Sequence, residues 1–116
     1  MAVLGTQTYD NLIVGGDIVT DSGVLIAGQN LTRGALLGKI TASGKLTLSV
    51  DTATDGSEAP YAVLNEDVDA TAGDTVCSVL LGGEVNSNVM TFGGAHTAES
   101  TKDGLRSLSI FLKTSA

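Results

Sequence analysis

The chain of 116 residues is long enough for one domain with a modest core, and only 3% of its residues are aromatic. It carries 13 acidic residues against six basic ones, which gives a formal net charge of −7. No Lys or Arg lies between Lys45 and Lys102, while nine acidic residues fall there, so this stretch would repel phosphate. Nucleic acid and an anionic membrane surface are therefore not expected as partners.

The N-terminal residues 1–22 show little of the periodicity that builds a core. Within them, Tyr9 to Val14 is an extended-looking patch that ends at Gly15 and Gly16. We predict that residues 1–22 form an extended arm, which becomes ordered when it adds to another protein as a strand. The alternative is an ordinary edge strand packed within its own domain. The segment also lacks the basic start and long apolar core of a signal peptide, which predicts synthesis in the cytoplasm.

Residues 23–116 are expected to form a single β-rich domain of short strands, because glycine-rich and polar turns separate short apolar runs. Thr75–Leu81 breaks strict alternation and is predicted to be a central strand with both faces buried. Gly38 indicates a bulge or a close packing contact. The predicted strands are Val24–Ala27, Ala35–Ile40, Lys45–Val50, Tyr61–Leu64 and Thr75–Leu81.

The C-terminal part predicts one short helix followed by a final strand. Thr97 is the expected N-cap, and Glu99 suits the positive end of the helix dipole, although Ser at position 100 leaves the usual capping box incomplete. After the helix, Leu108, Ile110 and Leu112 alternate with less apolar positions, as in a strand.

No constellation of residues indicates catalysis or a metal site, so we predict no enzyme activity, no cofactor and no metal. His96 is the sole histidine, lies just before the expected helix, and is expected to have a surface or capping role and not to act as a general base. Cys77 is the sole cysteine, lies in an apolar run and is expected to be a buried, inert thiol. Asp67 and Asp69 could hold a hard cation, but they lack the loop of an EF-hand.

Several motifs in a fixed order resemble one known family, the lambda-type head decoration proteins (protein D) of tailed bacteriophages. The motifs are Asp10–Ile13 before a glycine pair, Leu31–Ile40, Gly44–Lys45, Thr54–Ser57, Pro60–Leu64 running into Glu66–Ala70, and Gly83–Glu84. Each motif alone is turn or strand chemistry, and their order and spacing carry the resemblance. Residues 1–8 match no pattern of the family.

The resemblance implies a capsid cement protein with a small, compact, mostly β, barrel-like fold called a β-tulip. Such a protein is a homotrimer that binds the major capsid protein on the outside of the expanded head and stabilises the capsid lattice against packaged DNA. Its location is then the exterior of the virion capsid, after synthesis in the host cytoplasm.

Two sets of contact residues follow from this interpretation. The arm is expected to bind the capsid through Tyr9, Asn11, Leu12, Ile13 and Val14. The trimer interface is expected at Pro60, Tyr61 and Val63, because Pro60–Leu64 and Val76–Leu81 are more apolar than the loops around them. The alternative function is a small β-barrel module that binds a receptor or carbohydrate on a virion or cell surface, although such modules usually show aromatic residues in exposed loops.

Overall fold

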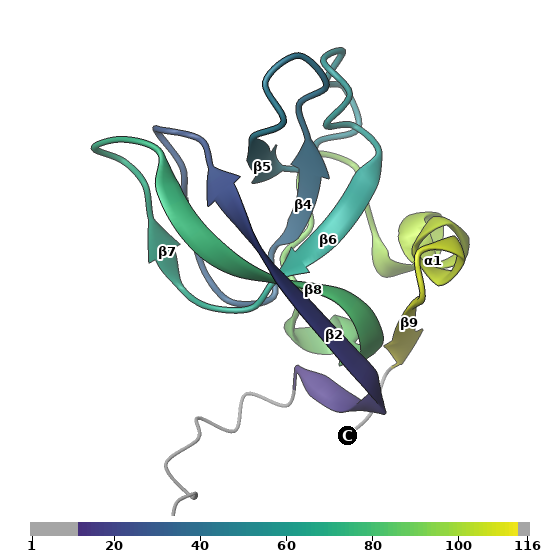
Figure 1. The fold of residues 1–116 in the computed structure, drawn as a ribbon. Helices are drawn as coiled ribbons and strands as arrows, with labels where there is room; N and C mark the ends of the chain where they lie inside the picture. The colour runs from purple at the N-terminus through teal and green to yellow at the C-terminus, as the bar shows by residue number, and fades with distance from the viewer. Residues whose placement is uncertain (1–11, 114–116) are drawn as a thin grey trace, which may run out of the picture.

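Five strands of the chain close into a ring in the computed structural model, which describes residues 12–113 (Figure 1). β2 pairs with β5, β5 with β4, β4 with β6 and β6 with β8, and β8 returns to β2. All of these pairings are antiparallel except the short parallel one between β2 and β5. The strands of the ring are β2 (Ile13–Leu25), β4 (Leu36–Lys39), β5 (Leu46–Leu48), β6 (Pro60–Leu64) and β8 (Thr75–Asn86).

β2 and β8 form the longest ladder of the barrel, running from Ile13 opposite Val85 to Leu25 opposite Thr75. Register shifts interrupt this ladder between Ile13 and Thr20, close to the glycine pair at positions 15 and 16. The division predicted between residues 22 and 23 therefore falls inside β2. Residues 13–22 pair with β8 of the same chain.

The core has two halves because the central strands are buried on both faces. Adjacent residues point to opposite sides of a strand, so Val79 lies in one cluster and Leu80 in the other. The first cluster fills the barrel, and the second lies outside it, beneath the helix. The first contains Leu25, Ala35, Leu37, Leu46, Ala62, Leu64, Val68, Ala70, Cys77 and Val79. The second contains Leu12, Leu36, Val63, Leu80, Val85, Leu105, Ile110 and Leu112.

The helix α1 (Ala98–Ser107) and the strand β9 (Ile110–Lys113) cover the second cluster. Thr97 is the N-cap, as predicted, but the capping box is complete: Thr97 Oγ1 accepts from Ser100 N–H at 3.0 Å, and Ser100 Oγ accepts from Thr97 N–H at 2.9 Å. A serine hydroxyl thus replaces the usual carboxylate. The final strand starts later than predicted, because Leu108 is the C-cap and Ser109 adopts a φ of 69°.

β9 pairs in parallel with the last four residues of β8, beyond the region of β8 that pairs with β6. The remaining elements are short: β3 (Asn30–Leu31) pairs with β7 (Val68–Asp69), and a 3₁₀ turn, η1, spans Ser87–Val89. The predicted fold class, a small mostly β barrel with one short helix near the C-terminus, is confirmed.

Gly38 lies where β4 approaches the loop before β6. A Cβ on Gly38 would stand 2.6 Å from the carbonyl carbon of Ser57 and 2.7 Å from its Cα. Both are backbone atoms, so no side-chain movement could relieve the contact. A register shift in the β4–β6 pairing also occurs between Leu37 and Gly38. The predicted close packing at Gly38 is therefore confirmed.

Within residues 12–113, no helix has the length and apolar character needed to cross a membrane.

Candidate interaction surface

The predicted contact residues of the arm occupy very different positions. Tyr9 and Asn11 lie outside the described residues. Leu12 is 1% exposed and packs in the second core cluster, and the half-buried Ile13 packs against the same cluster. Val14 lies within β2. In this conformation Leu12 stabilises the chain's own core, so a contact between Leu12 and another protein would require the start of β2 to leave that core.

The two ends of the described chain meet at one end of the barrel. Ile13 pairs with Val85 on one side of β8, and Leu112 pairs with Val85 on the other. We call this region, made of residues 12–13, 83–86 and 110–113, the terminal end; it lies at the bottom of Figure 1. The start of β2 and the strand β9 therefore flank the same stretch of β8.

Among residues 12–113, nothing pairs with one edge of β2 along most of its length. On the side away from β8, the pairing with β5 is limited to Leu25 opposite Leu46. Along the open part, Ile18 is 42% exposed and Val19 is 50% exposed, and the N–H of Ser22 donates to its neighbour Asp21 Oδ1 at 2.8 Å. A strand edge with exposed apolar side chains can pair with another chain.

The predicted trimer residues belong to β6, and the barrel buries most of their surface. Val63 is fully buried in the second core cluster. Pro60 and Tyr61 are half-buried, and Tyr61 packs against the first cluster with Lys39 Nζ 5.2 Å from its ring centroid. Val63 is therefore inaccessible to another copy in this conformation, whereas Pro60 and Tyr61 still present surface.

The apolar run of β8 also leaves one side chain outside. Val76 is 71% exposed and lies opposite the half-buried Val24 of β2. Sequence reasoning placed Val76 in a two-side-buried strand, but the start of β8 does not fit that description, which holds from Val79 and Leu80 onward, each at most 2% exposed. The start of β8 extends past the end of β6 and pairs there with β2.

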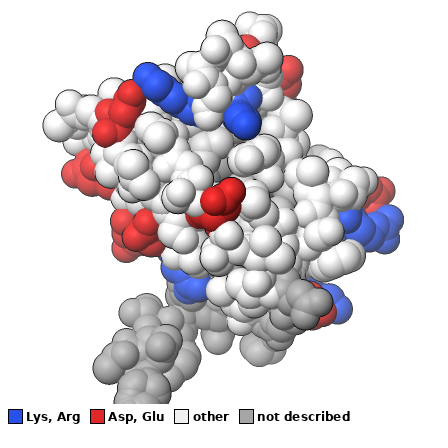
Figure 2. Space-filling model, viewed as in Figure 1, with Lys and Arg blue, Asp and Glu red and all other residues white. Residues whose placement is uncertain are grey.

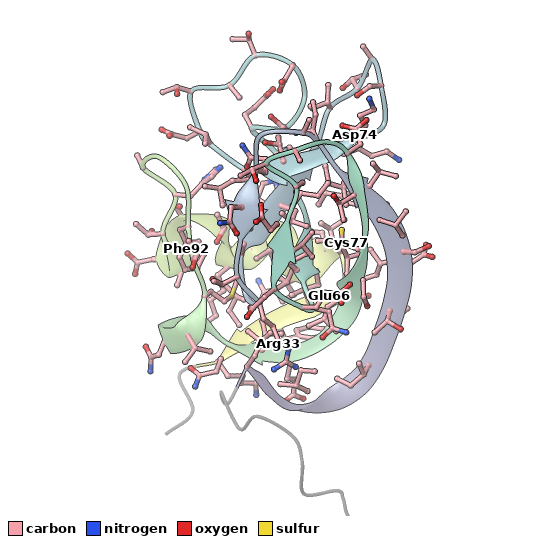
Figure 3. The ribbon with its side chains drawn as sticks, turned by 90° about the vertical axis from the view of Figure 1, so that its left-hand side faces the viewer. Arg33, Glu66, Asp74, Cys77 and Phe92 are labelled. Carbon is pink, nitrogen blue, oxygen red and sulfur yellow. The ribbon has the colours of Figure 1, made fainter. Side chains whose placement is uncertain are left out.

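The acidic side chains hold loops by accepting hydrogen bonds from backbone N–H groups. Several of these bonds join distant segments. In Figure 3, Asp74 lies toward one end of the barrel, and Glu66 lies near Arg33 toward the other. In Figure 2, acidic side chains gather on the left-hand side, where β7 lies in Figure 1. The long-range bonds are Asp74 Oδ1 with Ala27 N–H (2.8 Å), Asp67 Oδ1 with Arg33 N–H (2.8 Å), Asp51 Oδ1 with Ala95 N–H (2.8 Å) and Glu66 Oε2 with Ser78 N–H (2.7 Å).

Asp55, Asp69 and Asp74 have their pKa lowered, because hydrogen bonds from neighbouring donors favour the charged form. The hydroxyl and the N–H of Ser57 lower the pKa of Asp55, and those of Thr71 lower the pKa of Asp69. Lys45, whose Nζ lies 2.6 Å from Asp74 Oδ2, lowers the pKa of Asp74, and the N–H of Ala27 adds to this effect. The acidic surface therefore has a structural role that the sequence alone did not reveal.

Ser49 and His96 form a contact that could be mistaken for a catalytic pair. Ser49 Oγ is 2.7 Å from the carbonyl oxygen of Ser57 and 3.2 Å from His96 Nε2, which is itself 3.0 Å from the carbonyl oxygen of Glu58. A hydroxyl has one hydrogen, and the short bond assigns it to the carbonyl oxygen of Ser57. The carbonyl oxygen of Glu58 can only accept, so Nε2 carries the hydrogen of that contact. That nitrogen cannot then take a proton from Ser49.

This network instead connects the loop before β6 with the segment before α1. His96 is half-buried there, and Thr97, not His96, caps the helix. Sequence reasoning expected a surface or capping histidine and missed its contacts with Glu58 and Ser49, which lie 38 and 47 residues away. In the part of the chain that the structure describes, no group of three or more His, Cys, Asp or Glu side chains could hold a metal ion.

Comparison with known proteins agrees with this structural picture. A family model described as bacteriophage lambda head decoration protein D matches residues 3–111, so the match includes residues 3–8, in which sequence reasoning found no pattern of the family. No curated protein matched the chain.

Proposed function

Because the chain belongs to the bacteriophage lambda head decoration protein D family, we propose that it binds the outside of the expanded phage head as a trimer and stabilises the capsid lattice against packaged DNA. Membership of this family implies a role in capsid decoration and a location on the virion capsid. The observation that carries the proposal is the family match, which spans residues 3–111 of a chain of 116 residues.

The proposed role is structural and requires no catalysis, metal or cofactor. The family consists of structural phage proteins. The hydrogen bonding of Ser49 and His96 argues against an activated nucleophile, and the net charge of −7 disfavours nucleic acid and anionic membranes as partners. We further propose synthesis in the host cytoplasm before the protein joins the head.

The capsid-binding element is the N-terminal segment, with Tyr9 and Asn11 as contacts upstream of the barrel. Strand addition would draw affinity from main-chain hydrogen bonds, and the open edge of β2 near Ile18 and Val19 supports such a mode. Because Leu12 and Ile13 pack on the core in the free chain, we place the boundary of the arm before Leu12 and not after residue 22. Contacts of Leu12 and Ile13 with the capsid would require the start of β2 to detach, and Val14 stays a proposed contact.

The trimer contact is proposed around Pro60 and Tyr61, with the fully buried Val63 supporting them from the core. Closed rings of three use two different patches on each copy, so this surface would meet another part of the neighbouring chain. The core contains few aromatic residues, and burial of further apolar surface between copies would add stability.

A truncation that begins at Leu12 tests the capsid-binding element. Removal of residues 1–11 retains Leu12 and all of β2, so the truncated chain should fold with an unchanged melting temperature. It should lose binding to expanded, undecorated heads of the phage that encodes it, measured by co-sedimentation against the full chain. Unchanged affinity for the heads would refute the role of the arm.

The oligomeric state is tested separately by analytical ultracentrifugation and by imaging of decorated heads. A trimer in solution, or a trimer that forms on the head, supports the proposal. A monomer at high protein concentration, together with monomeric density on heads, contradicts it.

A further inference from the structure

A pocket of about 250 Å³ lies between α1 and β9, and its lining differs from the rest of the surface. Three of the chain's six basic residues line it, although the chain as a whole carries 13 acidic ones. Figure 2 shows cationic side chains on the right-hand side, where α1 and β9 lie in Figure 1. The lining residues are Lys102, Arg106, Phe111, Leu112 and Lys113.

Local acidic residues only partly neutralise these cations. Arg106 Nη2 lies 3.1 Å from Asp103 Oδ1, and Lys113 Nζ lies 3.7 Å from Glu84 Oε1. Pairs as exposed as these contribute little stability, so their partners can be exchanged at low cost. Lys102 and Arg106 also stand one turn apart on the exposed face of α1, where like charges repel.

The pocket combines this charge with apolar surface. β9 alternates buried and exposed residues, so Ile110 and Leu112 point into the core while Phe111 and Lys113 point outward. Phe111 is 42% exposed beside the cations. A large exposed aromatic residue with flanking cations is typical of an interface, where such side chains provide most of the binding energy.

We propose that this pocket binds an acidic segment of the major capsid protein, with carboxylates at Lys102, Arg106 and Lys113 and an apolar side chain against Phe111. Charge complementarity favours this occupant, because a strongly acidic chain concentrates half of its basic residues at one apolar pocket. The proposed pocket also rests on the proposed function, because Phe111 and Lys113 belong to the terminal end from which residues 1–11 continue.

The test replaces cations of the pocket with glutamine, which preserves helix propensity. Lys102→Gln should weaken binding to undecorated, expanded heads about threefold, and Lys102→Gln/Arg106→Gln should weaken it about tenfold, because each exposed ion pair contributes modestly. Lys45→Gln is the matched control, since it removes one Lys whose partner is Asp74, away from the pocket. The control should bind as the unmodified chain does, and the loss caused by the double variant should shrink as salt increases.

Phe111→Ala tests the apolar part of the pocket. This variant should weaken head binding at least fivefold with little change in melting temperature, because the side chain is substantially exposed.

Three results would overturn the inference. The first is binding of the double variant to heads as tight as that of the unmodified chain. The second is a loss of affinity in the control as large as that of Lys102→Gln. The third is loss of the trimeric state of the double variant in solution, which would assign the pocket to a contact between copies. Failure of the unmodified chain to bind heads refutes the proposed function itself, whereas normal binding by both the unmodified chain and the double variant refutes the pocket alone.

Discussion

Replacement of Leu12 by Ala separates two roles for the start of the chain, namely core packing and capsid binding. Leu12 is 1% exposed and packs with the second core cluster. A buried Leu→Ala change costs about 2–5 kcal/mol, since it removes apolar contacts and leaves a cavity. We expect a loss of about 3 kcal/mol, because Leu12 is fully enclosed but lies at the end of β2, where the chain can partly relax.

A loss of this size is easily measured by thermal unfolding. For a chain of this length, about 4 °C per kcal/mol predicts a fall in melting temperature of about 12 °C. Ile18→Ala is the control, because Ile18 is 42% exposed in the same strand and should change the melting temperature by no more than about 2 °C. If Leu12→Ala leaves the melting temperature unchanged but weakens head binding, Leu12 is a capsid contact and its assignment to the core is wrong.

Three further outcomes are expected. Gly38→Ala should destabilise the fold by about 3 kcal/mol in urea unfolding, because the new Cβ would meet the backbone of the loop before β6. Gly104→Ala should stabilise the fold by about 0.5–1 kcal/mol, because alanine favours a helix and a Cβ there would have nothing within 4 Å. Equal effects of the two variants would contradict the packing at β4. The melting temperature should fall as the pH drops below about 4, because the folded state lowers the pKa of Asp55 and Asp69. The charged carboxylates stabilise the fold above their ordinary pKa, and protonation at lower pH removes that stabilisation. Asp55→Asn should flatten this fall, and an unaltered pH profile would show that the hydrogen bonds of Asp55 do not contribute. The thiol of Cys77, whose pKa is raised by burial, should react with a disulfide reagent only on unfolding, and rapid labelling of the folded chain would contradict its burial.

The central strands were predictable because their pattern depends on neighbours along the chain. The run Thr75–Leu81 lacks alternation, and the structure shows why: Val79 faces the interior of the barrel while Leu80 faces the cluster beneath α1. The helix was predictable from Thr97, although the capping role of Ser100 depends on a rotamer that a sequence pattern does not reveal. The family motifs predicted the fold class and the family, and the match of the family model to residues 3–111 agrees with them.

Features that depend on distant contacts were not predictable in the same way. Lys45–Val50 alternates in sequence, yet Ser49 is fully buried because its hydroxyl finds partners in the loop before β6 and in His96. Leu12 lies in an apparently isolated patch, but strands and a helix from later in the chain, namely β4, β6, β8, α1 and β9, supply the rest of its core. The basic pocket likewise forms when α1 and β9 fold together, because its cations are spread over residues 102–113.

Cryo-electron microscopy of expanded heads incubated with the chain tests the proposed function most directly. We predict trimeric density on the outer surface at the local threefold positions, with residues 1–11 and the pocket between α1 and β9 directed toward the capsid protein. Heads that remain bare at saturating concentrations of the chain, or that carry isolated monomers, would contradict the proposal that this protein decorates the capsid as a trimer.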